Sequence, residues 1–196
     1  MLFRSGQRDN TQYLSTGGAA GRASAIARDF YGTELRITHR GTILARPYTA
    51  TAGLNVGFME DARTDSPATA GVISAAPTRN ETQKANNIDQ YVQGLWSVAD
   101  RWDVHAGVRH TRLRQSVTDH LPATNGNGTG SLSFDKTVPV IGTVFKATPV
   151  LNFYANVGKG FETPTMVEIS YSDTTGNGPN LGLKPATSTN IEVGSK

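Results

Sequence analysis

Residues 48–58 read YTATAGLNVGF and alternate strictly between two kinds of side chain. One parity is aromatic or apolar: Tyr48, Ala50, Ala52, Leu54, Val56 and Phe58. The other parity is polar or minimal: Thr49, Thr51, Gly53, Asn55 and Gly57. A period of two is the signature of a β-strand, because successive side chains point to opposite faces. The stretch therefore predicts a strand with one oily face and one wet face.

Two later stretches repeat this pattern. Residues 102–109 set Trp102, Val104, Ala106 and Val108 against Asp103, His105, Gly107 and Arg109. Residues 151–157 set Leu151, Phe153, Ala155 and Val157 against Asn152, Tyr154 and Asn156. Segments 88–98 and 136–147 are mixed, and His110 and Arg112 share the parity that is otherwise apolar. No sustained helical stripe is found, so the fold class expected is all-β.

We expect an antiparallel sheet in up-and-down order. Its strands are predicted at about 30–40, 48–59, 88–98, 101–118, 136–147, 150–159 and 189–195. Residues 1–29 are expected to be an irregular segment or a partial strand, and residues 30–196 to be one sheet-forming domain.

The joins between these strands alternate in length along the chain. The joins at 40–48, 99–101 (ADR) and 147–149 (ATP) are short, whereas 60–87, 119–135 and 160–188 are long and polar. Transmembrane β-barrels have this rhythm, with short periplasmic turns on one rim and longer extracellular loops on the other. The sequence therefore predicts a partial segment of a transmembrane β-barrel, with all three long joins on one rim.

The length of the first strand agrees with a bilayer. Ten steps of about 3.3 Å from Tyr48 to Phe58, tilted by about 45°, project to about 23 Å. The apolar band of such barrels is about 25 Å tall and is flanked by aromatic girdles. No apolar run approaches the roughly 18 residues of a spanning helix. The oily face is thus expected to meet lipid, and the wet face water.

Composition excludes several other classes of function. The chain of 196 residues has 37% hydrophobic content and a formal charge of +3, with lysine and arginine scattered rather than clustered, so we expect no nucleic-acid partner. The absence of cysteine rules out disulfides and thiol chemistry. The opening MLFRSGQRDN lacks the apolar region of a secretion signal.

No catalytic or metal-binding constellation is found in the sequence. GKG at 158–160 fails the P-loop pattern, and NGNGTG at 125–130 indicates a flexible loop tip. The four histidines, His39, His105, His110 and His120, lack ligand spacing, and His105 and His110 are predicted on opposite faces of one strand. We expect no enzyme activity, no cofactor and no metal site. Asp89, Asp103, Arg109 and Glu192 are expected on the wet face, with ligand-binding residues left unassigned.

Three segments of the second half resemble the barrel of TonB-dependent outer-membrane receptors. The first carries Trp102, Val104, Gly107 and Arg109 in DRWDVHAGVRHTRL (100–113). The second carries Tyr154, Gly160, Phe161, Pro164 and Thr165 in LNFYANVGKGFETPTMVEISY (151–171). The third carries Leu183, Pro185, Glu192, Gly194 and Lys196 in NLGLKPATSTNIEVGSK (180–196). The three occur in the order found in that family, and the resemblance covers roughly residues 30–196.

The resemblance implies location in the outer membrane and uptake of a scarce nutrient, most often a ferric siderophore. Implied partners are outer-membrane lipid, a siderophore-type ligand, and the TonB complex reached through a plug region. Such receptors are 22-stranded barrels around a plug, whereas this sequence predicts seven or eight strands, no plug and no closing strand with a terminal aromatic residue. It therefore reads as an internal piece of the barrel, one not expected to form a closed pore by itself.

Two alternatives remain open at the level of sequence. The first is a secreted or periplasmic β-sheet binding module, because a half-buried soluble sheet also alternates. The second is a small porin-like barrel. The direction in which Tyr48, Leu54, Trp102 and Phe153 face separates a lipid-exposed wall from a soluble core.

Overall fold

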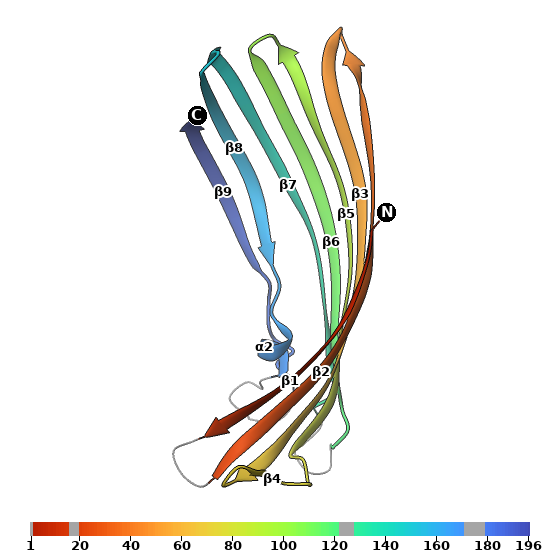
Figure 1. Cartoon of the computed structure of the whole chain (residues 1–196). Coiled ribbons are helices and arrows are strands. Elements are labelled where there is room, and N and C mark those ends of the chain that lie inside the picture. Colours follow the sequence, from red (N-terminus) through yellow and green to blue (C-terminus); the bar gives the residue numbers. More distant parts are fainter. Residues whose placement is uncertain (1, 16–19, 122–127, 171–178) are drawn as a thin grey trace.

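The computed structural model of the protein describes residues 2–15, 20–121, 128–170 and 179–196, and most of them form one antiparallel β-sheet (Figure 1). The elements are β1 (Leu2–Ser15), β2 (Ala20–Ile43), β3 (Arg46–Thr69), β4 (Val72–Ile73), β5 (Arg79–Ala99), β6 (Trp102–Asp119), β7 (Gly130–Thr148), β8 (Leu151–Glu162), α2 (Met166–Ser170) and β9 (Ala186–Ser195). The all-β prediction is confirmed.

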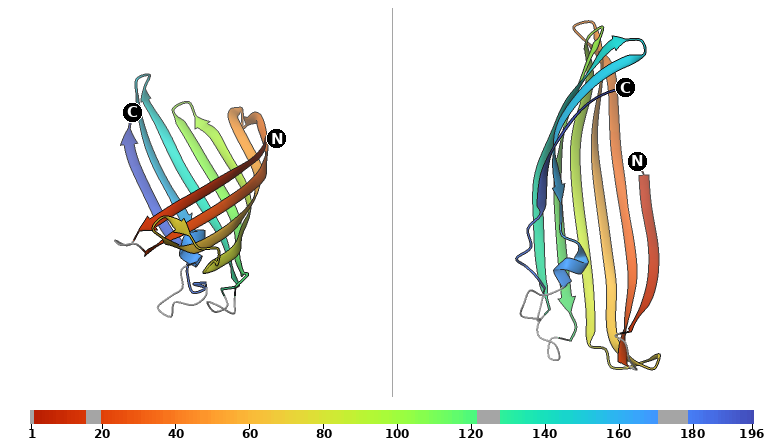
Figure 2. Two further views of the ribbon diagram at one scale, coloured as in Figure 1. Left: turned by 60° about the horizontal axis from the view of Figure 1, so that its bottom comes forward. Right: turned by 90° about the vertical axis from the view of Figure 1, so that its left-hand side faces the viewer.

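The strands follow one another across the sheet in chain order. The order is β1-β2-β3-β5-β6-β7-β8-β9, every pairing is antiparallel, and the short β4 pairs with β3. The sheet curves into an open trough with β1 and β9 at its two edges, and it is not closed (Figure 2). Up-and-down topology is therefore confirmed, and α2 is no crossover because β8 and β9 are direct neighbours.

The two rims differ as the join lengths predict. The turns at 44–45, 100–101 and 149–150 lie together at the upper rim in Figure 1. The joins β3–β5, β6–β7 and β8–β9, as far as their residues are described, lie at the opposite rim, together with α2 and β4. We call these the short-turn rim and the long-loop rim.

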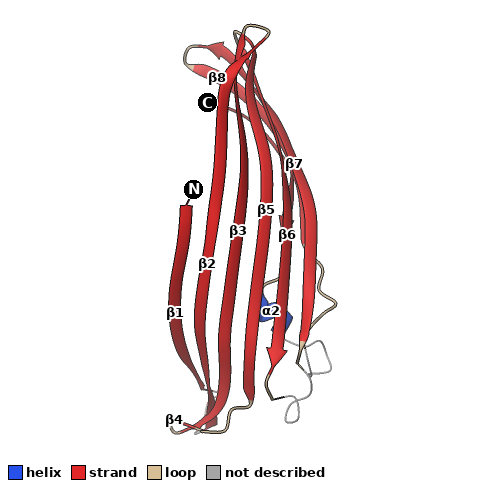
Figure 3. Cartoon of the chain, turned by 90° about the vertical axis from the view of Figure 1, so that its right-hand side faces the viewer, coloured by secondary structure: helices blue, strands red, loops and turns tan. Residues whose placement is uncertain are grey.

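The strands are much longer than predicted, and the long join at 60–87 is largely wrong (Figure 3). Residues 60–69 complete β3 and residues 79–87 begin β5, which leaves only 70–78 as the join. The joins at 119–135 and 160–188 likewise shrink to 120–129 and 163–185. A strand crosses a bilayer with about 9–11 residues, so strands of 21 or 24 residues extend well beyond it into water. There both faces are polar, and the apolar alternation that marks the membrane part disappears.

The N-terminal stretch is more regular than the sequence suggested. Residues 2–15 form β1, and residues 20–29 are the first part of β2. Residues 22–29 read RASAIARD and carry no clean alternation. They pair instead with the water-exposed part of β3, so the neighbouring strand specifies their conformation.

The β2–β3 hairpin sets the register of this half of the sheet. Ile43 pairs with Arg46 across a two-residue turn in which Leu44 and Ala45 have φ of 53° and 61°. Positive φ at both turn positions belongs to the primed turns, whose twist matches that of the flanking strands. These turns usually contain glycine or asparagine, and Leu-Ala gave no such signal in the sequence.

The predicted lipid-facing parities all lie on one face, here called the outer face. Tyr48 pairs with Trp96, and Trp96 with Val104, while Phe153 pairs with Phe145 and Phe145 with Trp102. Tyr31 stacks on Phe58 with ring centroids 5.0 Å apart, and Trp102 lies 4.8 Å from Phe145. The first pair is toward the long-loop rim and the second toward the short-turn rim. Apolar residues lie between two aromatic levels, as in a membrane barrel.

The strand register assigns the residues of the mixed segment 88–98 to the two faces of the sheet. Ile88, Val92 and Trp96 belong to the outer face, whereas Tyr91 is on the opposite, concave face. There its ring lies over Gly53, where an added Cβ would come within 2.3 Å of the ring. Glycine at 53 thus makes room for an aromatic ring on the polar side. No helix among the described residues is long and apolar enough to cross a membrane.

We predict opposite effects for arginine at two adjacent positions. Leu54→Arg, in the middle of the apolar outer face, is expected to cost about 2–4 kcal/mol of folding free energy in a bilayer, whereas Asn55→Arg on the concave face is expected to be nearly neutral. Urea titration of the liposome-inserted full-length protein measures both. Equal costs would show that the assignment of the two faces is wrong.

Candidate functional site

The concave face of the sheet, here called the inner wall, collects the buried polar residues. Every buried polar or charged residue described lies on it by register: Thr51, Asp61, Arg63, Asp65, Glu81, Gln83, Asp89, Gln115 and Asp119. Most of them lie toward the long-loop rim. A buried charge is costly unless it is paired and hydrogen-bonded, so the partners of these groups define what the wall can do.

Asp61 and Arg28 form the strongest pair of the inner wall. Both carboxylate oxygens of Asp61 accept hydrogen bonds from Arg28, at 2.7 Å from Nε and 2.6 Å from Nη2. Asp61 is only 1% exposed, and the two residues face each other directly across β2 and β3. This two-point geometry is the strongest form of arginine–carboxylate contact, and it ties the water-exposed ends of two strands together.

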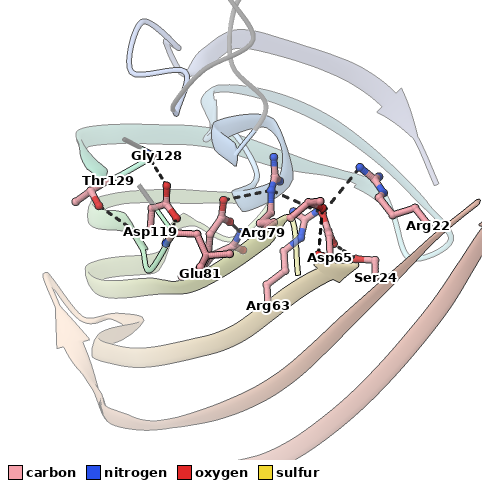
Figure 4. A network of polar contacts seen from close by, with 12 residues as sticks. Arg22, Ser24, Arg63, Asp65, Arg79, Glu81, Asp119, Gly128 and Thr129 are labelled. Carbon is pink, nitrogen blue, oxygen red and sulfur yellow. Dashed lines mark hydrogen bonds and ion pairs between the residues drawn. The ribbon is translucent and has the colours of Figure 1, made fainter. Parts of the chain in front are cut away.

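Asp65 is the centre of a larger network shown in Figure 4. Ser24 Oγ donates to Asp65 Oδ1 at 2.6 Å, and nitrogens of Arg22, Arg63 and Arg79 lie 3.9, 3.3 and 3.7 Å from Oδ2. Arg79 also reaches Glu81 at 3.4 Å. Three guanidinium groups therefore surround two carboxylates, and Asp119, which pairs with Glu81 across β5 and β6, adds a third carboxylate beside them.

Some donors of this network have no acceptor. Arg63 Nε and Arg79 Nη1 are buried without a hydrogen-bond partner among the described residues, and so is the acceptor Gln115 Oε1. Arg63 as a whole is only 5% exposed. Buried polar atoms are normally paired, so these three atoms are exceptions within the inner wall.

Asp119 organises the beginning of the β6–β7 join (Figure 4). Its carboxylate accepts the backbone N–H of Leu121 at 2.8 Å and that of Gly128 at 3.0 Å, while its own N–H donates to Thr129 Oγ1 at 3.0 Å. An aspartate that accepts local backbone donors is a turn-forming device. The two ends of this join are thereby held together at the rim.

A second polar cluster lies nearer the middle of the inner wall. Asp89 accepts hydrogen bonds from Asn87 Nδ2 at 2.9 Å and Thr111 Oγ1 at 2.6 Å, and Arg109 Nη2 lies 3.1 Å from its Oδ2. Closer to the short-turn rim, Asp103 pairs with Lys146 at 2.7 Å, and Tyr154 donates to Glu192 at 3.1 Å. The register places Asp89, Asp103, Arg109 and Glu192 on the inner wall as predicted.

Helix α2 docks part of the β8–β9 join against the inner wall. Ile169 is fully buried, and with Met166 it packs against Val117, surrounded by Met59, Ala85, Leu132 and Leu183. Gln115 Nε2 donates to the carbonyl of Pro164 at 3.1 Å, and Asn180 N donates to the carbonyl of Ile169 at 2.8 Å. This small apolar cluster holds α2 against the concave side of the sheet; Figure 2 shows the helix beside the lower ends of the strands.

Thr165 and Glu168 begin α2 with a reciprocal cap. Glu168 N donates to Thr165 Oγ1 at 3.3 Å, and Glu168 Oε2 accepts the Thr165 N–H at 2.7 Å, which is the capping-box arrangement. The backbone hydrogen bond from Thr165 lowers the pKa of Glu168. The cap therefore contributes stability at neutral pH and loses it as the pH falls through that lowered pKa.

The inner wall presents groups that are suited to binding. No group of three or more potential metal ligands occurs among the described residues. His105 and His110 lie on opposite faces, as predicted. The wall offers charged and amide groups on a rigid sheet, open toward the long-loop rim, and these can hold a polar ligand or another protein segment.

Sequence reasoning missed the most buried charges. Asp61, Arg63 and Asp65 all lie in the stretch that we had assigned to a long join, and Arg28, the half-buried partner of Asp61, lies in the segment assigned as irregular. The signal was present as charges at every second position in 61–65, with Ala62 and Thr64 between them. It was weak because the intervening residues are not strongly apolar.

Comparisons with known proteins agree on the fold. The family model described as "TonB dependent receptor-like, beta-barrel" matches residues 2–196. The solved ferric citrate transporter FecA, unliganded, superposes with a TM-score of 0.83 at 16% identity, covering 97% of this chain and 28% of that one. The ferric yersiniabactin uptake receptor FyuA from Yersinia pestis gives 0.72 at 17% identity, covering 98% and 29%.

A third similar structure is the ferripyoverdine receptor of the outer membrane of Pseudomonas aeruginosa bound to ferripyoverdine. It gives a TM-score of 0.70 at 13% identity, covering 98% of this chain and 28% of that one. The chain thus spans under a third of each of these structures. At such identities the likeness shows the fold alone.

We predict that two adjacent acidic residues differ in their contribution to stability. Asp61→Asn should cost about 1.5–3 kcal/mol, because Arg28 loses its charged partner on the inner wall. Glu60→Gln, whose outer-face pair with Lys84 is half exposed on both sides, should cost under about 1 kcal/mol. Denaturant titration of the full-length protein compares them, and a larger loss for Glu60→Gln would contradict the burial described.

We also predict that the docking of α2 on the inner wall depends on the Ile169 side chain. Ile169→Asp should release the β8–β9 join from the inner wall, because a carboxylate would replace a fully buried side chain in an apolar cluster. Val167→Asp, at a position 51% exposed on the same helix, is the matched control and should leave the join docked. Limited proteolysis and hydrogen exchange of residues 163–185 report the difference. Equal protection in both variants would show that the docking does not depend on Ile169.

Proposed function

This chain belongs to the TonB-dependent receptor family and forms part of its β-barrel, and from that premise we propose that the full-length receptor imports a scarce nutrient across the outer membrane. The family consists of outer-membrane transport proteins and not of enzymes. A ferric siderophore is the first candidate ligand. The three similar structures described above are named for ferric citrate, ferric yersiniabactin and ferripyoverdine, which makes ferric chelates the first class to test.

The observation that carries this proposal is the asymmetry of the sheet. Its outer face is apolar between two aromatic levels, and its inner wall buries paired charges. A soluble binding module would bury its apolar face in a core. Here Ile37, Val92, Ile141 and Phe153 are exposed on the outer face, which suits a wall with lipid outside and water inside.

Our proposal gives the inner wall near the long-loop rim a part in ligand passage. In the Asp65 network, the side chains of Arg22 and Arg79 keep 42% and 23% of their surface exposed to the trough. Carboxylate, catecholate or similar oxygen-rich groups would complement these donors. Ligand contacts from loops and plug, and the TonB complex acting through that plug, would complete the site in the full-length receptor.

The other candidate is passive diffusion through a porin-like barrel, and energy coupling separates the two. Cells lacking the full-length gene should lose uptake of at least one radioactive iron chelate. Complementation should restore uptake only when TonB is present. Uptake that is restored equally without TonB would refute active transport and favour the porin-like alternative.

One pair of variants tests the part assigned to the inner wall. Arg79→Gln should raise the half-saturating chelate concentration roughly tenfold or more, because one hydrogen bond to a charged group contributes about 1.5–3 kcal/mol. Arg101→Gln removes the same charge from the opposite, short-turn rim and should leave uptake unchanged. Receptor abundance is measured in both strains. An unchanged half-saturating concentration in Arg79→Gln would remove this residue from the proposal while leaving TonB-dependent uptake intact.

A further inference from the structure

The apolar contact between α2 and the sheet contains two methionines. Of the three methionines in the chain, Met59 and Met166 are those whose placement the structure describes, and both lie in this contact. Met166 on α2 is only 7% exposed, whereas Met59 on β3 is half-buried. Three buried residues, Val117, Met166 and Ile169, form the centre of the cluster. Two thioether side chains therefore make up a large share of a small apolar contact.

Met59 also lines a hollow in the inner wall, which extends from it toward the short-turn rim. The hollow has a volume of about 430 Å³. Its floor is bare backbone where Gly32 pairs with Gly57, and a Cβ added at Gly57 would come within 2.4 Å of Asn87 Oδ1. Phe30, which also lines the hollow, is 43% exposed, so the hollow communicates with the trough. A small polar solute in the trough can therefore reach Met59 without displacing α2.

Helix α2 depends on the apolar contact because it is too short to be stable by itself. It has five residues, and isolated helices shorter than about 12–15 residues are marginal in water. The capping box of Thr165 and Glu168 stabilises the first turn but does not attach it to the sheet. The hydrogen bond from Gln115 to the carbonyl of Pro164 attaches only the residues before the helix. Docking of α2 itself therefore rests mainly on the cluster to which Met59 contributes.

We propose that Met59 is a site of oxidation to methionine sulfoxide, and that this modification releases α2 from the inner wall. The oxidant is hydrogen peroxide in the water of the trough. A lone pair of the thioether sulfur attacks one peroxide oxygen, and the S–O bond forms as the O–O bond breaks. The second oxygen takes the proton of the first and leaves as water. The sulfur loses two electrons and the peroxide gains them, which is the ordinary route from methionine to its sulfoxide.

The sulfoxide is incompatible with the docked position of α2. Oxidation changes a flexible apolar side chain into a polar one, and a buried oxygen needs a hydrogen-bond donor. The side chains of Val117, Met166 and Ile169 carry no N–H or O–H group. Rotation of the sulfoxide toward the hollow would hydrate its oxygen but withdraw the side chain from the cluster. Either arrangement weakens the contact, so the oxidation state of one sulfur decides whether α2 covers this part of the inner wall.

Peroxide titration of the full-length receptor in detergent tests this. Peptide mass spectrometry follows the gain of one oxygen at each methionine, and hydrogen exchange follows residues 163–170 in the same samples. Met59 should be oxidised at least about fivefold faster than Met166, because Met59 lines the hollow and Met166 is buried. Protection of residues 163–170 should fall in proportion to the Met59 sulfoxide, and Met166 should become reactive only afterwards.

Matched variants separate Met59 from the other methionines. Met59→Leu nearly conserves the side-chain volume and cannot be oxidised, so residues 163–170 should stay protected at the same peroxide concentration. Met166→Leu should still lose protection, because Met59 remains. Met59→Gln supplies a polar side chain without an oxidant and should expose residues 163–170 before any peroxide is added. Heat-modifiable mobility reports whether each variant is folded.

Any of three results would overturn the proposal. They are equal initial oxidation rates of Met59 and Met166, complete oxidation of Met59 with unchanged protection of residues 163–170, and equal loss of protection in Met59→Leu and the unsubstituted receptor. If Met59→Leu does not fold, Met59→Gln takes its place, and retained protection in that variant would equally overturn the proposal. The inference rests on the proposed function only in that the inner wall faces water. None of its readouts is iron-chelate uptake, so its failure leaves the transport proposal standing.

Discussion

The structure depends on one constraint: within hydrocarbon, each backbone N–H and C=O must be hydrogen-bonded inside the protein, and a sheet can do this only through its neighbouring strands. The consequence is a ladder that runs from β2 to β7 through strands of 18 to 24 residues, with its one register shift at Ser97–Ala99, beside the short-turn rim. Because a strand alternates its side chains, the same ladder presents every residue to one of two solvents. Glu60 and Asp61 are chain neighbours, yet the first is half exposed outside and the second is almost fully buried inside.

The part of the fold that could be predicted is the part in which the two solvents differ most. Between Tyr48 and Phe58 lipid and water impose opposite side-chain chemistry, and the alternation indicates the strand, its face and its length. Beyond Phe58 neither face is expected to meet lipid, so 60–69 and 79–87 are mostly polar on both faces and resemble a loop. Backbone pairing with the neighbouring strand keeps them extended all the same. Composition could not show this, because the cause is a hydrogen-bond ladder to residues far away in sequence.

The polar network of the inner wall was unpredictable for a related reason. Its partners are distant in sequence, with Arg28 and Asp61 separated by 33 residues and Ser24 and Asp65 by 41. Yet in each pair the residue on β2 lies as many positions before Ile43 as its partner on β3 lies after Arg46. Had the two-residue turn at Leu44 and Ala45 been recognised, the whole set of partners on β2 and β3 would have followed. The missing information was a single turn, hidden because neither residue is a usual occupant of positive φ.

The charges of the inner wall also specify the register that brings them together. A slip of one residue between β2 and β3 would not merely separate Arg28 from Asp61. Because the side-chain period is two, it would bring residues from opposite faces into register. If β3 turned over to restore pairing, Asp61, Arg63 and Asp65 would face outward, and Leu54 and Val56 would face water. Alternative pairings are therefore penalised by the loss of the Arg28 and Ser24 contacts at one end of the strand and by apolar surface turned to water at the other. The polar network thus contributes to specificity as well as stability, and it does so in the region where the apolar pattern no longer distinguishes the two faces.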